Sequence, residues 1–588
     1  CKNILVDACI GSGKTTAIQH LCNALPADRK ILYLTYNRLL KIDAQAKIKK
    51  SNATVTNYHG FAASALRKAG MTSAVPELIQ DFNNKKPAIE RFDVLIIDEY
   101  QDIEQELAEM LSYIKSVNPE MQIIAVGDME QKIYDKTTLK VPAFIYSFLQ
   151  EHIELEFTRC FRLSADLAAK LGRVWNKNIL GVNGACVVEE MPVDEAVRFL
   201  SEQKPQDILC LGARTGDLSD ALNQLEQEYP AKFNKSTVYA SISDKDGSGA
   251  IKPKTTSAIF TTFDSSKGLE RKICVVFDFT ESYWQVRISK PQQSYEILRN
   301  IFCVAASRGK ARIIFVNSGE KMLSEKTLST RDEDNLRFEN VEISEMFDFK
   351  YKEDIEECYA LLKTTPVAAA GDFSEINIKN QDELIDLSPC IGIYQEALFF
   401  GGYDIEKNIE LWLDINKDRK DKNILYSEKD RKLPLDNKIL ILTSLETRQN
   451  RYRNQVDTPF VNSNEKKRII DRLSELFTRD ETVQTPCSIR FSDTENGKIL
   501  FSALGLTDVV KNDIVYELKF VSELTHEHFL QCACYVIALG LEKGVLWNTR
   551  NNTRHEITVP DERKFLDAVA KTITRGYVET YYPPRDGG

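Results

Sequence analysis

The sequence predicts an α/β protein built from two lobes, each a parallel sheet with helices on both faces, and a third α/β domain at the C-terminus. Three observations predict this class. A strand at residues 2–6 leads through a glycine-rich loop into a helix, the apolar run 94–97 ends at two carboxylates, and strands at 504–510 and 514–520 are joined by a tight turn. A chain of 588 residues is long enough for three or four domains of about 150 residues each.

The composition is that of an ordinary globular protein. Hydrophobic residues make up 43% and charged residues 28%, which excludes collagen-like and wholly disordered chains. No apolar run approaches the roughly 18 residues of a membrane span. The net charge of −10 means that a nucleic acid would have to meet local basic surfaces. The 13 cysteines include no CxxC pair, so we expect a cytoplasmic protein, and because the chain begins with a strand and no Met we expect further residues upstream.

The first loop has the pattern of a phosphate-binding (Walker A) loop. The segment that ends at Thr15 reads ACIGSGKT. Gly11 and Gly13 let backbone N–H groups turn toward a polyphosphate at the N-terminus of a helix. Lys14 would reach the β and γ phosphates, and the Thr15 hydroxyl would bind Mg²⁺. Thr16 follows in the first turn of the helix and is included among the expected nucleotide-binding residues.

The buried strand that ends at Asp98 and Glu99 supplies the acidic partner of this loop. Parallel strands deliver their polar residues to the same edge of a sheet, so these carboxylates are expected beside the phosphates. Asp98 would hold Mg²⁺, and Glu99 would polarise the water that attacks the γ phosphate. A protein that only bound ATP would not need Glu99, so the pair favours hydrolysis.

Further short segments follow in a fixed order up to Arg308. Together they resemble the motifs of superfamily 1 helicases of the UvrD/Rep type, which have two RecA-like lobes. The residues at these motif positions are Thr35, His59, Gln131, Tyr134, Arg162, Thr262, Gly268, Glu270 and Arg308.

The resemblance implies a role for each position. Gln131 would sense the γ phosphate, and Tyr134 would stack on the adenine. Arg162 and Arg308 would contact the γ phosphate from opposite sides of a cleft between the lobes, where a planar guanidinium can bind two oxygens. The other positions are expected to line the nucleotide (Gly268 and Glu270) or to face the nucleic acid and link it to the ATP site (Thr35, His59, Thr262 and Glu270).

The sequence also departs from this family. Cys160, Asp264 and Arg271 replace its usual Asn, His and aromatic residue, which affects the expected nucleic-acid path more than the ATP site. The two intervals that normally hold accessory subdomains are short. Only 38 residues separate His59 from Asp98, and only 47 separate Arg214 from Thr262. We therefore expect a reduced two-lobe motor without strong processive unwinding.

Composition also suggests domain boundaries. Residues 1–145 and 146–318 are expected to form the two RecA-like lobes, and residues 376–588 the third domain. Between them, residues 319–357 contain 13 acidic and 6 basic side chains, and a polar stretch follows. We predict a charged connector at 319–375; an acidic helical face packed on the motor is the alternative.

A second reaction centre is predicted at the C-terminal hairpin. Period-two alternation places Glu517 and Lys519 on one face of their strand, and Asp508 can approach them from the neighbouring strand. Two carboxylates and a backbone carbonyl form a site of hard oxygen ligands for Mg²⁺. A nearby Lys can then orient water or stabilise the charge that develops on phosphate.

These residues resemble the PD-(D/E)xK nucleases, and in particular their RecB-like branch, which has a restriction-endonuclease-like α/β fold. Gln531 and Tyr535 form the QxxxY signature of that branch on the following helix and would face nucleic acid. The branch also uses an acid from an earlier helix, for which Glu396 is the first candidate and Glu465 the second. Only two cysteines follow Asp508, so no iron–sulfur cluster is expected.

Between these two parts of the expected nuclease lies a short segment that combines three arginines with one aromatic residue. Arg448, Arg451 and Arg453 surround a tyrosine, a combination that suits phosphate contacts and base stacking. A solvated basic loop is the alternative.

The sequence therefore predicts an ATP-dependent DNA translocase or helicase fused to a Mg²⁺-dependent DNA nuclease, with Mn²⁺ as an alternative ion at the nuclease site. The expected partner is DNA that is single-stranded or has free ends; a second protein subunit is left open, and no membrane is expected. Two settings fit: DNA end processing in repair, and defence against phage or plasmid DNA. The alternative is a nucleotide-sensing ATPase that gates the nuclease or a partner complex without productive unwinding.

Overall fold

The computed structural model describes residues 2–36, 38–73, 77–242, 251–289, 294–331, 340–369, 371, 373–378, 384–415, 417, 426–492 and 499–582. The chain divides into two compact units. The first contains residues 1–188, 295–312 and 324–331, and the second contains residues 189–294, 313–323 and 332–588. None of the helices in the described residues is both long and apolar enough to cross a membrane.

The first unit contains a six-stranded sheet with the order β3-β2-β4-β5-β1-β6, in which all neighbours are parallel. Its strands are β1 (Asn3–Ala8), β2 (Ile31–Thr35), β3 (Ala53–Asn57), β4 (Val94–Asp98), β5 (Gln122–Gly127) and β6 (His152–Phe157). Since β6 belongs to this sheet, the first lobe extends beyond the boundary expected at residue 145.

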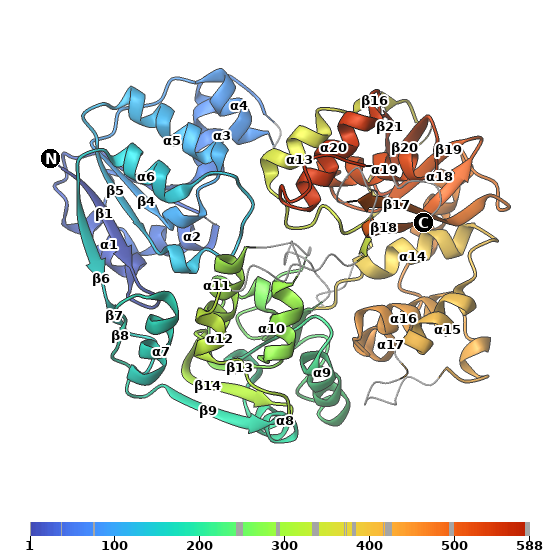
Figure 1. Cartoon of the computed structure of the whole chain (residues 1–588), viewed down its shortest axis with the longest axis horizontal. Helices are drawn as coiled ribbons and strands as arrows, with labels where there is room; N and C mark the ends of the chain where they lie inside the picture. Colours follow the sequence, from blue (N-terminus) through green and yellow to red (C-terminus); the bar gives the residue numbers. More distant parts are fainter. Residues whose placement is uncertain are drawn as a thin grey trace. The chain divides into compact units, whose positions relative to one another are not determined.

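Helices cover both faces of this sheet, as the sequence predicts (Figure 1). On β4, Leu95 and Ile97 pack against α3–α6, whereas Val94 and Ile96 pack against α1 and α2. This alternation explains why the strand is apolar throughout. The helices are α1 (Lys14–Ala24), α2 (Arg38–Lys47), α3 (Tyr58–Lys68), α4 (Leu78–Lys85), α5 (Gln105–Val117) and α6 (Val141–Leu149), with short 3₁₀ turns η1 (Tyr100–Asp102) and η2 (Met129–Gln131).

The first unit is completed by segments from further along the chain. These are the small sheet of β7 (Arg159–Cys160) and β8 (Leu180–Gly181), and the helices α7 (Ala165–Trp175), α11 (Tyr295–Ala305) and α12 (Glu325–Ser329). Residues 146–188 and 295–312, which were expected in the second lobe, therefore group with the phosphate loop.

A second six-stranded sheet has the order β11-β12-β10-β13-β14-β9. Its strands are β9 (Val187–Pro192), β10 (Ile208–Gly212), β11 (Val238–Ser241), β12 (Ala258–Thr262), β13 (Arg271–Val276) and β14 (Gly309–Asn317). One face packs against α8 (Val193–Glu202) and α9 (Asp217–Glu228). Further short elements are η3 (Pro205–Asp207), η4 (Phe263–Ser265) and α10 (Glu281–Ile288).

The C-terminal domain contains a mixed seven-stranded sheet with the order β15-β18-β19-β20-β21-β16, in which β17 also pairs with β18. Its strands are β15 (Val341–Glu342), β16 (Lys363–Val367), β17 (Thr482–Ser492), β18 (Ile499–Lys511), β19 (Ile514–Lys519), β20 (Lys543–Asn548) and β21 (Thr553–Thr558). The pairs β17–β18 and β18–β19 are antiparallel, whereas β19–β20 is parallel.

Helices cover this third sheet on both faces. One layer consists of α13 (Lys352–Tyr359), α19 (His526–Ala538) and α20 (Glu562–Ile573). The other consists of α14 (Ser388–Phe399), α15 (Ile405–Ile415), α16 (Leu435–Thr447), α17 (Arg451–Gln455) and α18 (Ser463–Ser474), with the 3₁₀ turn η5 (Asp430–Lys432) beside them. The predicted fold class, two parallel-sheet lobes and a C-terminal α/β domain, is confirmed.

The predicted hairpin between β18 and β19 is present, with a two-residue turn. Asn512 and Asp513 both have positive φ, 50° and 57°. This is the pattern of a type I′ turn, whose twist matches that of the strands and for which Asn and Asp are among the favoured residues. The turn sets the register in which Val509 pairs with Tyr516, and therefore which residues of β18 face β19.

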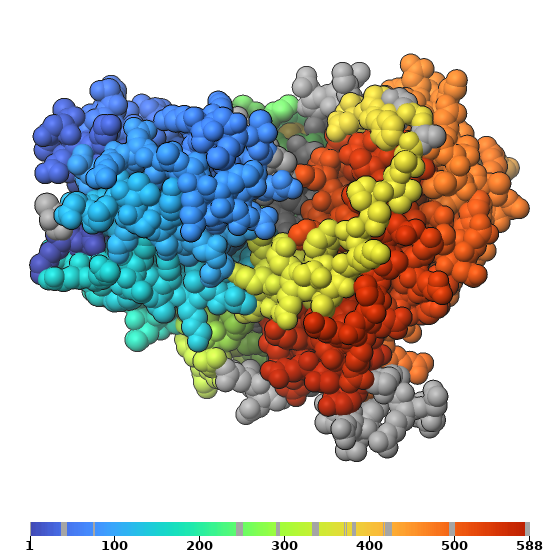
Figure 2. Space-filling model, turned by 90° about the horizontal axis from the view of Figure 1, so that it is seen from above, coloured from blue at the N-terminus to red at the C-terminus, as the bar shows by residue number. Residues whose placement is uncertain are grey.

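The prediction of a separate connector at 319–375 is wrong for most of the described part. β15 pairs with β18 and β16 pairs with β21, so both strands belong to the C-terminal sheet. Ile355 and Cys358 on α13 are buried in its core. Figure 2 shows this segment in yellow, lying against the red surface of the C-terminal domain. The segment contains many charged residues, so its composition does not indicate a buried face. Residues 332–339 lie outside the described part.

A buried junction joins the second sheet to the helical layer of the C-terminal domain within the second unit. Arg451 on α17 is 1% exposed, and its Nη2 lies 3.0 Å from Glu226 Oε1 on α9 and 2.8 Å from the Val238 carbonyl oxygen. Beside this pair, Asn223 donates to the Arg448 carbonyl at 3.0 Å. The Asn450 N–H in turn donates to Asn223 Oδ1 at 2.9 Å.

Replacing Arg451 with Met is expected to lower the free energy of unfolding of the second unit by about 3–5 kcal/mol, because Glu226 would remain as an uncompensated buried carboxylate. The double substitution Arg451→Met with Glu226→Gln is expected to recover most of this loss. Urea denaturation of the three proteins measures both effects. Equal losses in the single and double variants would show that the ion pair is not what stabilises the junction.

Candidate active sites

The phosphate loop lies between β1 and α1, and two glycines allow its path. Gly11 and Gly13 have φ values of 67° and 80°, which favour glycine, and α1 begins directly at Lys14. A Cβ at Gly11 would lie 2.8 Å from the Cβ of Arg162, and the Phe161 N–H donates to the Gly11 carbonyl at 2.9 Å. The segment that carries Arg162 therefore packs directly on the loop. Thr15 is half-buried and Thr16 is exposed on α1.

Asp98 ends β4 as predicted and is 1% exposed. Its Oδ2 accepts a hydrogen bond of 2.8 Å from the Tyr33 hydroxyl, while Oδ1 has no hydrogen-bond partner among the described residues. Burial, and then Glu99, raise the pKa of Asp98 to about 7, against the opposing effects of Tyr33 and Lys14. A buried carboxylate with one oxygen left over fits a Mg²⁺ ligand. Sequence reasoning did not identify Tyr33, which has no pattern of its own.

Glu99 and Gln131 are positioned by one hydrogen-bonded chain. Gln101 Nε2 donates to Glu99 Oε2 at 2.5 Å, and Gln101 Oε1 accepts from the Asp128 N–H at 3.0 Å. Gln131 Nε2 donates to Asp128 Oδ2 at 2.7 Å. Glu99 itself has a φ of 56°, a left-handed conformation that is uncommon for a residue with a side chain. The expected base and the expected γ-phosphate sensor are thus linked through Asp128.

Arg308 lies in the same compact unit as the phosphate loop. It is 4% exposed, and its Nε donates to the Val304 carbonyl at 3.0 Å. It follows α11, which is anchored by Asn300: Asn300 Nδ2 donates to the Met129 and Lys132 carbonyls at 3.2 and 3.0 Å. These carbonyls flank Gln131, so α11 is fixed to the segment that carries the expected sensor.

Three other expected residues of the first unit occupy different environments. Thr35 is fully buried at the end of β2, His59 is exposed on α3, and Tyr134 is half-buried after η2. An exposed ring such as that of His59 can reach a ligand directly. Thr35 in contrast can act only through its neighbours or after local movement.

The motif around Thr262 lies in the second unit, at the end of β12. Thr262 is 7% exposed, and Gly268 has a φ of 75° in the loop before β13, where Glu270 is half-buried. Asp264, which stands where the helicase family has His, forms two hydrogen bonds with Arg287 of α10, at 3.0 and 2.9 Å. An internal ion pair therefore accounts for this departure.

The hairpin brings the predicted nuclease residues together. The pairing of Val509 with Tyr516 places Asp508 opposite Glu517 on the neighbouring strand. Asp508 Oδ2 accepts from the Leu518 N–H at 2.6 Å, which fixes its carboxylate beside β19.

Lys519 and the QxxxY helix complete this site. Lys519 Nζ lies 2.9 Å from Glu517 Oε1 and 2.8 Å from Gln531 Oε1. Gln531 Nε2 donates to Glu517 Oε1 at 2.8 Å and to the Tyr535 hydroxyl at 3.2 Å. The signature residues Gln531 and Tyr535 are both buried; Gln531 contacts Glu517 and Lys519 directly, and Tyr535 contacts Gln531.

Glu396 lies on α14 and is 9% exposed. Its Oε2 accepts from Gln484 Nε2 at 2.5 Å. Gln484 is on β17 at the position opposite Asp508, between the pairs Val483–Val509 and Thr485–Thr507, and its φ is 54°. Such backbone strain clusters at functional sites. No sequence signal marks Gln484.

The carboxylates of the nuclease site shift one another's pKa values. Burial, and also Glu517, raise the pKa of Glu396 to about 8, although Gln484 and Lys519 lower it. Burial, and then Glu517, raise the pKa of Asp508 well above its usual value. Glu465, the second candidate, instead pairs with Arg468 at 3.0 Å on its own helix.

The donor set of the nuclease site fits a divalent metal. Burial raises the pKa of Glu517, and its Oε2 has no hydrogen-bond partner among the described residues. Excess buried carboxylate of this kind is stabilised by a cation. The ligand oxygens of Glu396, Asp508 and Glu517 do not all lie within 4.8 Å of one another. Among the described residues, that criterion is met by a different group, Asp7, Asp128 and Glu130.

The predicted basic segment is largely engaged within the protein. Arg451 is internal, so its predicted contact with nucleic acid is not available in this conformation. Arg453 Nη2 bonds Asp430 Oδ1 at 3.0 Å, and Arg448 Nη1 donates to the Thr215 carbonyl at 3.3 Å. The basic pattern in this segment reflects the junction described above.

Two family models match the chain. Residues 1–137 match a model described as an AAA domain, and residues 475–559 match the PD-(D/E)XK nuclease superfamily. The second range includes Asp508, Glu517 and Lys519. No curated protein matches the chain.

The similar solved structures include three helicases. The arterivirus nonstructural protein 10 (helicase) with DNA is 12% identical, with a TM-score of 0.30 and coverage of 53% of this chain and 60% of that one. The DUF1998 helicase MrfA bound to DNA is 12% identical (TM-score 0.31; 54% and 47% covered), and Bacteroides sp Pif1 in complex with ADP-AlF4 is 12% identical (TM-score 0.29; 56% and 90% covered). This chain thus spans less than two thirds of the arterivirus helicase. Scores this low carry no inference about activity.

The two family matches confirm the pairing of domains that the sequence predicts. Domains of these kinds generally use ATP and a divalent metal. The chain therefore matches an AAA domain over residues 1–137 and the PD-(D/E)XK nuclease superfamily over residues 475–559.

Proposed function

We propose that this protein is an ATP-dependent DNA translocase or helicase coupled to a Mg²⁺-dependent DNA nuclease. The observation that carries the proposal is the presence of two separate sites in one chain. In each site a buried acid, Asp98 or Glu517, keeps one oxygen without a hydrogen bond, and a lysine lies in the same site.

In the ATPase site, Lys14 and Thr15 are proposed to bind the β and γ phosphates and Mg²⁺ with Asp98. Glu99 is proposed to accept the proton of the attacking water, held in place by Gln101. Gln131, Arg162 and Arg308 are proposed to contact the γ phosphate, with Tyr134 on the adenine. The packing of Arg162 on Gly11 supports this arrangement, because it places the guanidinium-bearing segment on the phosphate loop.

In the nuclease site, Glu396, Asp508 and Glu517 are proposed to hold the divalent metal, which would polarise the scissile phosphate and activate water. Lys519 is proposed to stabilise the negative charge that develops on the phosphate. The hydrogen bonds of Gln531 fix both Glu517 and Lys519 before substrate arrives, so little reorganisation is needed during the reaction.

The proposed biological settings are DNA end processing and defence against phage or plasmid DNA. Both require cleavage to respond to the motor. The junction around Arg451 supports such a response, because it ties the C-terminal domain to the second sheet through buried polar contacts. Rates of ATP hydrolysis measured with and without single-stranded DNA test the motor part. Stimulation by DNA is expected, and hydrolysis that ignores every DNA substrate would contradict a translocase.

The two candidates for the third metal ligand can be separated by substitution. Glu396→Gln is expected to weaken Mg²⁺-dependent cleavage by about 10–100-fold, with recovery at higher Mg²⁺ or Mn²⁺, because one ligand is lost. Glu465→Gln, a matched change on α18, is expected to have no such effect. Metal titrations of the cleavage rate measure both variants, and the reverse result would assign the ligand to Glu465.

A further inference from the structure

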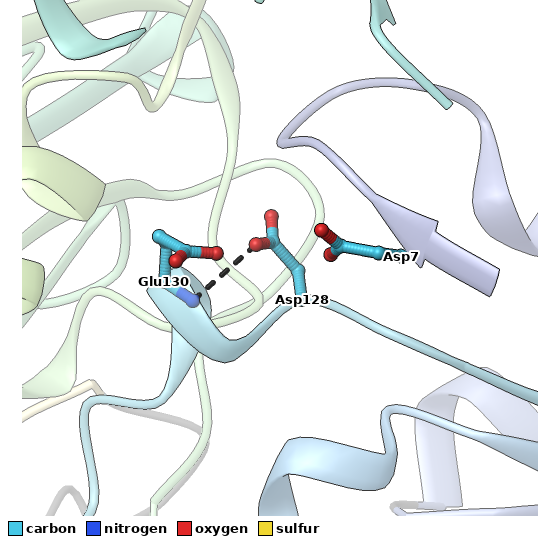
Figure 3. Close-up of side chains that lie close together, drawn as sticks. All are labelled: Asp7, Asp128 and Glu130. Atoms are coloured by element: carbon cyan, nitrogen blue, oxygen red, sulfur yellow. Dashed lines mark hydrogen bonds between the residues drawn. The ribbon is translucent and has the colours of Figure 1, made fainter. Parts of the chain in front are cut away.

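Three acidic side chains converge beside the phosphate loop. Asp7 on β1, Asp128 after β5 and Glu130 in η2 have carboxylate oxygens within 4.8 Å of one another. Figure 3 shows Asp128 between the other two. Asp7 pairs in register with Gly127, the residue before Asp128, so the carboxyl ends of two adjacent parallel strands create this concentration of charge.

The cation at the centre of this cluster is the ammonium group of Lys177. Its Nζ lies 2.6 Å from Asp7 Oδ1, 3.0 Å from Asp128 Oδ1 and 2.9 Å from Glu130 Oε2. An ammonium has three N–H donors, so one side chain can satisfy three carboxylates. Lys177 is 14% exposed and Asp128 1% exposed, so solvent screens the contact between these two weakly, whereas Asp7 is 44% exposed.

The backbone holds Lys177 in this place. α7 ends in a Schellman motif: Asn176 has a left-handed φ of 52°, and the Lys177 N–H donates to the Gly172 carbonyl at 2.8 Å. The side chain therefore starts from a fixed point in the chain. Lys177 also helps to keep Asp128 ionised: burial raises the pKa of Asp128, but Lys14, Lys177 and the hydrogen bonds with Glu130 and Gln131 together lower it.

Asp128 connects Lys177 to the expected ATPase residues through hydrogen bonds. Its second oxygen accepts from Gln131, and its backbone N–H reaches Glu99 through Gln101. One connected series of contacts thus runs from Lys177 to the expected γ-phosphate sensor and to the expected base. Without the ammonium, three carboxylates this close together would repel one another, and Asp128 would move or take up a proton.

We propose that Lys177 is a positioning residue of the ATPase site, which holds Asp128 so that Gln131 and Glu99 face the γ phosphate and its attacking water. The proposal rests on the proposed ATPase function. It predicts an effect on the γ phosphate in particular, because the hydrogen bonds of Asp128 lead to Gln131 and, through Gln101, to Glu99.

Lys177→Met tests this role, because it removes the charge and keeps most of the aliphatic stem. In the full chain, kcat for ATP hydrolysis is expected to fall by about 10²-fold, the effect of misplacing a reacting group by about 1 Å. The ratio of the affinity for a non-hydrolysable ATP analogue to that for ADP is also expected to fall. Lys170→Met, which changes an exposed lysine of the preceding helix α7, serves as the control and is expected to change neither value.

A second variant keeps the test decisive if Lys177→Met is poorly folded. Lys177→Met with Glu130→Gln relieves the repulsion but still leaves Asp128 without its ammonium partner, so a low kcat and a low affinity ratio are expected to persist in a folded protein. If kcat and the affinity ratio both return to the wild-type values, Lys177 only neutralises charge and the proposal is overturned. A wild-type protein that binds the analogue without hydrolysing ATP would instead refute the proposed ATPase function, and the affinity ratio would still report on Lys177.

Discussion

Substitution of Lys519 by Met is expected to lower the rate of DNA cleavage by about 10²–10³-fold, the usual effect of removing one charge-stabilising donor from an active site. Lys519 Nζ is shared between Glu517 and Gln531, so its loss removes the positive charge of the site and one partner of each of these residues. ATP hydrolysis should be unchanged, because the residues assigned to it lie in another domain. Gel-based cleavage assays and phosphate release measure the two rates.

Two companion variants interpret this result. Asp508→Asn preserves shape and removes a proposed metal ligand, so it is expected to abolish cleavage as well. Lys564→Met, an exposed lysine on α20, is the control and should cleave normally. If neither Lys519→Met nor Asp508→Asn changes cleavage of any DNA substrate, the C-terminal domain is a binding module and another part of the chain cuts.

The second large effect is expected for Lys14→Ala. Lys14 is buried at the first residue of α1, and its loss is expected to slow ATP hydrolysis by about 10²–10³-fold, because the charge on the β and γ phosphates is no longer compensated. Lys68→Ala on α3 is a suitable control, since its exposed pairing with Glu90 at 3.4 Å contributes little to stability. Phosphate release at saturating ATP measures both variants.

The effect of Lys14→Ala on DNA cleavage distinguishes the two functional models. If the motor feeds DNA to the nuclease, cleavage of long linear DNA should collapse together with ATP hydrolysis. If the ATPase is a nucleotide-sensing gate, cleavage should persist or rise in the variant without ATP. The same preparation therefore decides between coupling by translocation and coupling by inhibition.

Local sequence patterns were sufficient for the parts of both sites that form within one loop or hairpin. Gly11, Gly13 and Lys14 lie where a strand–loop–helix pattern places them, and Asp508, Glu517 and Lys519 follow from strand alternation and a short turn. In each case the geometry is fixed by neighbours in sequence, so periodicity and turn chemistry determine it.

Residues that act across long sequence separations could not be predicted in this way. Lys177 meets Asp7 from 170 residues away, and Gln484 meets Glu396 from 88 residues away. A single lysine or glutamine carries no periodic signal, and only the folded sheet brings it to its partner. The same limit applies to Arg451. The neighbouring arginines predict a nucleic-acid contact, but nothing in the sequence indicates that Arg451 pairs with the buried Glu226.

The connector illustrates a different limit. Its charge balance is acidic, but Ile343, Met346 and Phe347 are buried in the C-terminal core. Composition averages these positions with the exposed acids around them, so the average hides the apolar contacts. Strand pairing with β18 and β21 is decided by residues far along the chain.

ATP turnover and metal-dependent strand scission are proposed to belong to one machine. The most direct test is cleavage of linear and circular DNA by the purified full chain with Mg²⁺, in the presence and absence of ATP. Mg²⁺-dependent cleavage is expected, with a rate that changes with ATP and is lost in Lys519→Met. Cleavage that is identical with ATP, without ATP and in Lys14→Ala would contradict this proposal.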